Sequence, residues 1–135
     1  MKTKSLPQLE KQLDTIFSRF IRLRDSDDNG WVRCISCGTP HNVTDIDCGH
    51  FIKRGKLSTR FHEKNCNGQC RGCNRYKNGN EAMYSYHLNQ KWGAGTSDLL
   101  VMLSSQPAKY SRFDYEIMIK EYKAKVKKLK EEKGL

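Results

Sequence analysis

Two short cysteine motifs constrain this chain more than any other feature of its sequence. Cys34-Ile-Ser-Cys37 and Cys70-Arg-Gly-Cys73 are both C-x-x-C pairs, in which a tight turn directs two sulfur atoms to the same side. Two such pairs supply the four thiolates that a tetrahedral structural zinc ion prefers. A redox dithiol needs only one pair, so the second pair favours zinc. The sequence therefore predicts a structural zinc site formed by these four cysteines.

The other two cysteines, Cys48 and Cys66, lie between the motifs. We expect them to be small buried apolar residues, although Cys66 could replace one zinc ligand and His41 is a weaker alternative ligand. The N-terminal segment has no apolar run typical of a signal peptide, and no window approaches the roughly 20 apolar residues of a membrane span. A cytoplasmic protein without a membrane partner is expected, and in that reducing compartment cysteines serve as metal ligands more often than as disulfides.

The size and composition of the chain favour one small domain over residues 1–135. Of the 135 residues, 36% are hydrophobic and 30% are charged, which is a modest supply of material for a core. Structural zinc contributes on the order of 10 kcal/mol to folding. Zinc could therefore stabilise a centre that is rich in loops.

Hydrophobic spacing predicts an N-terminal helix within residues 1–25, beginning at a capping box formed by Ser5 and Gln8. The following DSDDNG string matches the first half of a calcium loop, but Ser36 stands where the final acidic ligand would be, so a solvated turn is expected. Residues 31–80 form the predicted zinc and catalytic centre. Within it, short strands are expected at residues 31–32 and 43–46, and mostly loop at residues 47–72.

Residues 81–135 are predicted to form C-terminal helices that end in a basic tail. Asn80 is expected to cap a helix that stops at Gly93, and Thr96 or Ser97 to cap a second one. The tail helix is amphipathic, and its apolar face carries Tyr115, Met118, Ile119, Tyr122, Val126 and Leu129. This face could pack on the core or form a dimer, and its lysines could contact phosphates; the sequence leaves these alternatives open.

The charge of the chain points to nucleic acid as its partner. There are 25 Lys and Arg residues against 15 Asp and Glu residues, a net charge of +10, and Glu63 is the single acid in residues 51–80. Basic residues near the cysteine motifs are expected to contact the DNA backbone rather than to read the base sequence. These are Lys53, Arg54, Lys56, Arg60, Arg71, Arg75 and Lys77.

Four residues between the two cysteine motifs or directly after the second one have the side chains that phosphodiester hydrolysis requires. His50 is suited to accept a proton from water, and Asn65 to fix the His50 loop by hydrogen bonding. Asp47 and Asn74 offer the hard oxygen ligands that Mg²⁺ or Mn²⁺ prefers. A histidine beside a glycine is more often a packing residue, but its place between two zinc motifs favours catalysis.

The strings CISCGT, DCGH, RFHEKN and QCRGCN, followed by Gly79-Asn80, resemble the phage lambda NinG, or Rap, family of recombination nucleases across approximately residues 14–92. The resemblance implies a magnesium-dependent endonuclease that cuts branched DNA such as Holliday junctions and D-loops, in the host cytoplasm if the protein is encoded by a phage. The C-x-x-C-N string is also similar to endonuclease VII-type junction resolvases, which implies that Asn74 binds the catalytic ion. In related HNH proteins the acid directly precedes the histidine, whereas Asp47 lies three residues before His50.

The expected fold is α+β: a zinc-stapled ββα-metal, or HNH-like, centre with flanking N- and C-terminal helices. A homodimer is expected because a two-fold enzyme can place two cuts across one junction. Two alternatives share the same residues: a general or nicking HNH nuclease without branch preference, and a non-catalytic zinc module that only binds DNA.

Overall fold

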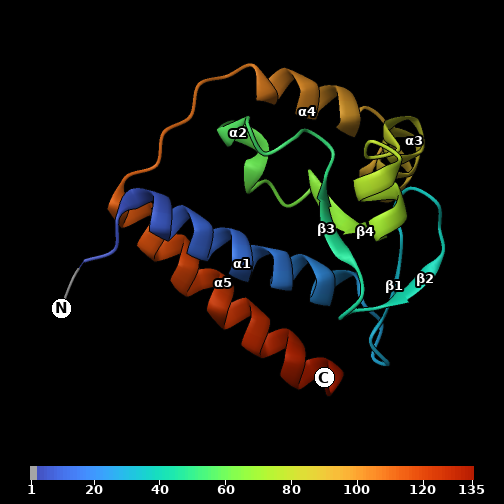
Figure 1. Ribbon diagram of the computed structural model, residues 1–135, viewed down its shortest axis with the longest axis horizontal. Helices are drawn as coiled ribbons and strands as arrows, with labels where there is room; N and C mark the ends of the chain where they lie inside the picture. The colour runs from blue at the N-terminus through green and yellow to red at the C-terminus, as the bar shows by residue number, and fades with distance from the viewer. Residues whose placement is uncertain (1–2) are drawn as a thin grey trace.

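Two long helices lie side by side along one edge of the molecule (Figure 1) in a computed structural model that describes residues 3–135. Helix α1 spans Leu6–Asp25 and begins with the predicted capping box, in which Ser5 and Gln8 exchange hydrogen bonds. Helix α5 spans Arg112–Lys133 and has a second capping box at Ser111. The helices run in the same direction, since Tyr115 reaches Glu10 near their beginnings and Lys133 reaches the Leu23 carbonyl near their ends.

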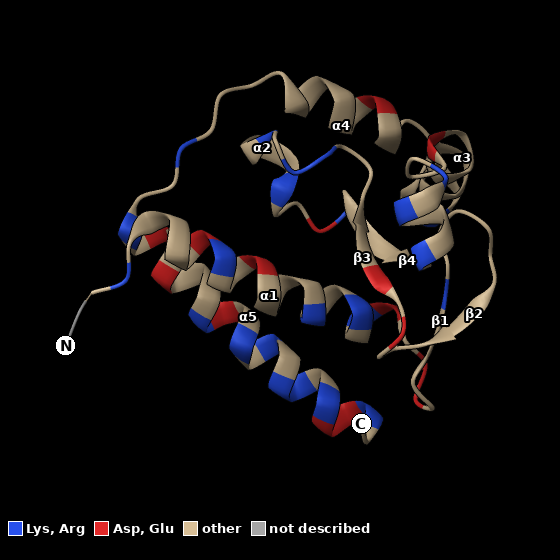
Figure 2. Ribbon diagram, viewed as in Figure 1, with Lys and Arg blue, Asp and Glu red and all other residues tan. Residues whose placement is uncertain are grey.

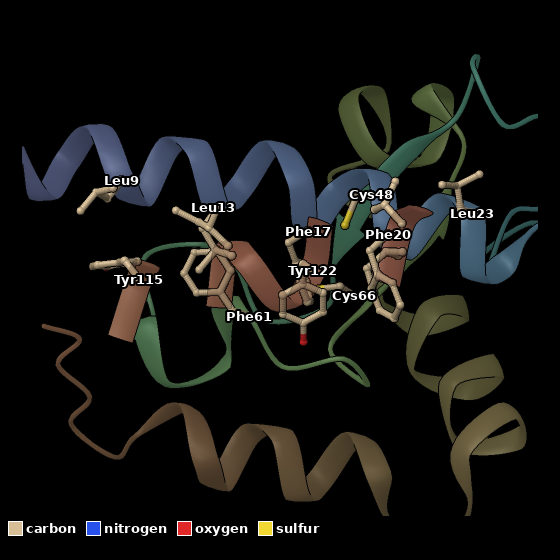
Figure 3. Packing of buried hydrophobic residues seen from close by; sticks show 13 residues of the cluster. Leu9, Leu13, Phe17, Phe20, Leu23, Cys48, Phe61, Cys66, Tyr115 and Tyr122 are labelled. Atoms are coloured by element: carbon tan, nitrogen blue, oxygen red, sulfur yellow. The ribbon is translucent and has the colours of Figure 1, made fainter. Parts of the chain in front are cut away.

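The core lies where α1 and α5 meet the centre of the chain, and aromatic rings pack against one another within it (Figure 3). The Tyr122 ring packs edge-on against Phe17 with 4.9 Å between ring centroids, and Phe61 packs edge-on against the same phenylalanine at 5.8 Å. The apolar face of α5 is therefore used for packing within the chain. Of the alternatives that the sequence left open for this face, core packing is the one observed.

Leu13 is fully buried in this core, which makes its replacement a test of the packing. Leu13→Ala should lower the free energy of unfolding by about 2–5 kcal/mol because it removes buried methyl groups and leaves a cavity. Leu6→Ala at the exposed start of the same helix should cost less than half as much. Urea denaturation of both variants measures the difference, and equal losses would contradict the packing described.

The first cysteine motif lies in a small hairpin. Strand β1, Trp31–Arg33, pairs antiparallel with β2, Pro40–Asn42. The prediction of a strand at residues 43–46 was wrong, because the Asn42 side chain accepts hydrogen bonds from the backbone and hydroxyl of Thr44 and so turns the chain there. The preceding acidic string is a turn, as predicted, in which Asp27 accepts from the backbone of Asn29 and Trp31.

A second hairpin forms in the segment predicted to be mostly loop. Strand β3, Asp47–His50, pairs antiparallel with β4, Cys66–Gln69, and the short helix α2, Leu57–Arg60, lies in their connection. The prediction of loop at residues 47–72 was wrong here. These strands contain Gly, Cys, Asn and Gln rather than β-branched residues, so tertiary packing against α1 stabilises them instead of intrinsic strand propensity.

The chain then turns through η1, a π-helical turn at Gly72–Tyr76, into α3, Glu81–Trp92, and α4, Thr96–Ser104. Gly93 ends α3 and Asn80 is its N-cap residue, both as predicted, but the prediction of Thr96 or Ser97 as the N-cap of α4 was wrong. Asn80 has a left-handed backbone, with φ of 45°, and its side chain makes no capping hydrogen bond. Gly95 occupies the N-cap of α4. Within residues 3–135, none of the helices has the length and apolar character needed to span a bilayer.

Candidate functional site

The four cysteines of the two motifs come together between the β1–β2 turn and the β4–η1 junction. Their sulfur atoms all lie within 4.8 Å of one another, and those of Cys37 and Cys70 are 3.7 Å apart. A tetrahedral site with bonds of about 2.3 Å separates its sulfurs by about 3.8 Å. The geometry therefore fits a metal ion such as zinc, held by Cys34, Cys37, Cys70 and Cys73.

Hydrogen-bond donors surround these sulfur atoms. The backbone N–H of Ser36 lies 3.4 Å from the Cys34 sulfur, and the Asn80 side-chain amide lies 3.5 Å from the Cys73 sulfur. Such donors stabilise thiolates, the form that binds metal. The alternative ligand His41 is outside this cluster, with its Nε2 2.9 Å from the Thr39 hydroxyl, and Cys66 is outside it as well.

His50 stands at the end of β3 with one ring nitrogen held by backbone. Its Nε2 lies 2.9 Å from the Arg60 carbonyl oxygen, which can only accept a hydrogen bond, so Nε2 carries the proton and Nδ1 keeps the lone pair. Burial lowers the pKa of His50 to about 4, and the nearby Arg54 charge adds to this effect against the opposing hydrogen bond with Arg60. The imidazole is therefore neutral at pH 7 and has a lone pair that can accept a proton.

The Asn65 side chain joins the loop that follows His50 to helix α2 by hydrogen bonds. This fully buried side chain donates to the carbonyls of Ile52 and Thr59, both at 3.0 Å, and accepts from the Ile52 N–H at 2.8 Å. The loop that it joins leads directly to Arg60, whose carbonyl orients the imidazole. Asn65 is thus linked to the His50 ring through the backbone.

Replacing Asn65 should destabilise the protein markedly. Asn65→Ala removes three hydrogen bonds, one from the Ile52 N–H and one each to the Ile52 and Thr59 carbonyls, so the free energy of unfolding should fall by about 2–4 kcal/mol. Asn29→Ala, on an exposed turn, should change it by less than about 0.5 kcal/mol. Urea denaturation followed by circular dichroism compares the two variants. An Asn65→Ala variant as stable as the wild type would show that these hydrogen bonds do not hold the loop.

Two adjacent cavities share part of their walls beside His50. The larger, about 400 Å³, contains Asp47 and Asn74 in its wall, and the smaller, about 260 Å³, contains His50 and Lys53. The residues Cys48, Arg54 and Asn74 line both. The three residues predicted to act on water and metal therefore lie along one cleft, which has cationic side chains in its walls.

Asp47 is engaged within this cleft. Its carboxylate accepts two hydrogen bonds from Arg75, both at 2.9 Å, and one from the Asn74 side-chain amide at 3.0 Å. The Arg75 side chain is 55% exposed, so it can move aside without disrupting the core. A divalent cation could then use the Asp47 carboxylate and, after rotation of the amide, the Asn74 oxygen.

Six of the seven predicted DNA-contacting residues line a cavity or are exposed to solvent, and the seventh, Arg60, is paired with α1. Arg54, Arg71 and Arg75 line the larger cavity, Lys53 lines the smaller one, and Lys56 and Lys77 are exposed outside both. Arg60 instead points to α1, where its guanidinium pairs with Asp14, at 3.0 Å, and with Glu10. Its charge is neutralised within the fold, so its position does not support the predicted phosphate contact.

The cleft also contains residues that the sequence did not indicate. Ser18 and Arg22 of α1 line the larger cavity. Arg22 also lines a neighbouring cavity, together with Arg19 of the same helix and Lys130 of α5. Figure 2 shows Lys and Arg on both helices in this part of the fold. Periodicity marks the apolar stripe of α1 but says nothing about what faces its polar side, so no sequence signal could have found these residues.

The fold and site define a class: a small α+β protein with a four-cysteine cluster suited to a metal such as zinc, beside a basic polar cleft. The chain belongs to the NinG family, since the family model described as Bacteriophage Lambda NinG protein matches residues 1–132. The family predicted from the sequence motifs is thereby confirmed.

Similar proteins carry the name Protein ninG. Those of Salmonella phage P22, Escherichia phage lambda and Escherichia phage 933W are each 36% identical to this chain over 89 residues, which is 65% of the chain. The matched region covers 41%, 41% and 42% of these relatives, so the chain spans less than half of their length. No solved structure matches the chain.

Proposed function

We propose that this protein is a metal-dependent DNA endonuclease that cuts branched recombination intermediates in the host cytoplasm. The observation that carries the proposal is the state of His50: a neutral imidazole, held at Nε2 by the Arg60 carbonyl, beside a basic cleft that also contains Asp47 and Asn74. A neutral, oriented base next to hard oxygen ligands is what hydrolysis of a phosphodiester requires.

In this mechanism His50 takes the proton of the attacking water on its Nδ1. Asp47 and Asn74 would hold Mg²⁺ or Mn²⁺, which supplies charge neutralisation at the phosphate and at the leaving oxygen. Arg54 and Arg71 contribute positive charge along the DNA backbone on either side of the cleaved bond. Asn65 keeps the His50 loop in place through its three hydrogen bonds.

The order of elements supports a ββα-metal assignment. Strand β3 carries His50, β4 pairs with it, and the helical turn η1 follows with Asn74 facing the same cleft. The cysteine cluster clamps the start of this turn to the β1–β2 hairpin, which suits a structural rather than a catalytic metal because all four positions are filled by protein ligands.

The preference for branched DNA rests on family resemblance, and so does the homodimer. The apolar face of α5 is covered by α1, so a dimer would need another surface. Light scattering checks this part of the proposal: a particle with twice the 15.7 kDa chain mass supports a dimer, and a single-chain mass both free and on DNA rejects it.

The substrate is tested by comparing a labelled four-way junction with a linear duplex of matching sequence at one Mg²⁺ concentration. Faster cutting of the junction, with no cutting of either DNA in EDTA, is the expected result. Equal rates would favour the general or nicking nuclease. Tight binding without cutting would favour the zinc module that only binds DNA.

A further inference from the structure

A second group of metal-binding side chains lies on the β3–β4 hairpin, apart from the four-cysteine cluster. Cys48 and His50 are two residues apart on β3, so their side chains lie on the same face of the hairpin. Cys66 pairs directly with His50 and lies on that face too. Sulfur atoms of both cysteines and a ring nitrogen of His50 all lie within 4.8 Å of one another. Neither cysteine has a role in the proposed hydrolysis.

The surroundings of this group resemble those of an open metal site. Cys66 is fully buried and Cys48 is nearly so, while Cys48 and His50 also line the smaller cavity, of about 260 Å³. Three protein ligands and an accessible fourth position for water are the arrangement of open zinc sites. The three ligand atoms are separated by no more than 4.8 Å, and a tetrahedral site separates its ligand atoms by roughly 3.5–3.8 Å, so the side chains would have to bring them together by at most about 1 Å.

The chemistry of the ligands selects the ion. Two thiolates and an imidazole are soft to intermediate donors, which bind Zn²⁺, Co²⁺ or Cd²⁺ and discriminate against Mg²⁺. When a divalent ion binds, the two thiols release their protons, and the ion with two thiolates has no net charge. A neutral site can be buried at this place despite the neighbouring charges of Lys53 and Arg54.

A disulfide is a poorer use of the two cysteines. Cys48 pairs across the hairpin with Gly68, so Cys66 stands two residues away from the direct partner, in a diagonal position. Diagonal Cα atoms lie about 7–8 Å apart. A disulfide joins Cα atoms no more than about 6.8 Å apart.

We propose that Cys48, His50 and Cys66 form a second site for a thiophilic divalent ion, and that its occupation switches off the nuclease. The regulatory part rests on the proposed function. Neutral imidazole has a single lone pair, and a metal ion bound to His50 uses the lone pair that would otherwise take the proton of water. Excess Zn²⁺ would thus inhibit an enzyme that Mg²⁺ activates.

Cobalt binding tests the site without reference to activity. Reduced, zinc-loaded protein is titrated with Co²⁺, and its zinc content is measured before and after to verify that the four-cysteine cluster keeps its ion. One further equivalent of Co²⁺ should bind and produce sulfur-to-cobalt charge-transfer absorption, about half as intense as that of a four-thiolate site because two thiolates contribute. Cys66→Ala and Cys48→Ala should each weaken binding at least about tenfold. Absence of this absorption in the wild type would overturn the site.

Inhibition tests the regulatory role. Wild type and Cys66→Ala are assayed for junction cleavage in Mg²⁺ with Zn²⁺ added in excess of the structural equivalent. Zn²⁺ should stop the wild type and spare the variant, which keeps His50, Asp47 and Asn74. Equal sensitivity of the two proteins would overturn the switch. If no cleavage occurs even without added Zn²⁺, the proposed function fails, whereas the cobalt result still decides whether the site exists.

Discussion

His50→Ala should reduce the rate of DNA cleavage by about 10²–10⁴-fold while leaving DNA binding nearly unchanged. The imidazole is the base in the proposed reaction, and alanine cannot take the proton of water. Its contact with the Arg60 carbonyl is a single hydrogen bond, so the loss of fold stability should be small compared with the loss of rate. Single-turnover cleavage of a labelled junction measures the effect, and gel-shift titration measures binding.

The matched control is His62→Ala. His62 lies in the α2–β4 connection and lines neither of the two cavities, so its loss removes an imidazole without touching the cleft. The control should cleave within about threefold of the wild type. Comparable losses in both variants, or wild-type rates in His50→Ala, would remove His50 from the role of base.

Cys70→Ser should abolish stable folding of the centre of the chain. The four-cysteine cluster joins the β1–β2 hairpin to the β4–η1 junction, and structural zinc typically contributes on the order of 10 kcal/mol or more, which exceeds much of the total stability of a small domain. Strong chelation of the wild type should have the same result. Circular dichroism, thermal denaturation and zinc content are the measurements.

A serine substitution elsewhere controls for the general effect of losing a thiol. Cys48→Ser leaves the four-cysteine cluster intact, so this variant should retain the structural zinc and a cooperative unfolding transition. A Cys70→Ser variant that kept its zinc content and its unfolding midpoint would show that the cluster is not a structural zinc site.

Features of the fold that depend on local sequence were predictable. Helix α1 begins at the capping box of Ser5 and Gln8, and the predicted face of the tail helix is the one that packs on α1. Strands β3 and β4 were missed because their DCGH and CNGQ sequences have little strand propensity. They form because α1 covers them and because Gly68 lets the chain approach Val32, whose Cγ1 would lie 2.5 Å from an added Cβ.

The candidate site was predictable where motifs mark it and unpredictable where tertiary structure builds it. Recognisable strings contain the cysteine pairs, His50, Asn65 and Asn74. In the structure His50 and Asn74 line one cavity, and Asn65 holds the loop that follows His50. The position of Arg22 in the cleft depends on how α1 docks. The neutralisation of Arg60 depends in the same way on an acidic partner 46 residues away in the sequence.

The most direct test of the account is the Mg²⁺ dependence of cleavage by the zinc-loaded wild-type protein on one end-labelled four-way junction. With the zinc content held constant, the cleavage rate should be undetectable in the absence of Mg²⁺, should rise as Mg²⁺ is added and should then saturate. A junction that is bound but remains uncut at every Mg²⁺ concentration would contradict the account, and so would a cleavage rate that does not depend on Mg²⁺.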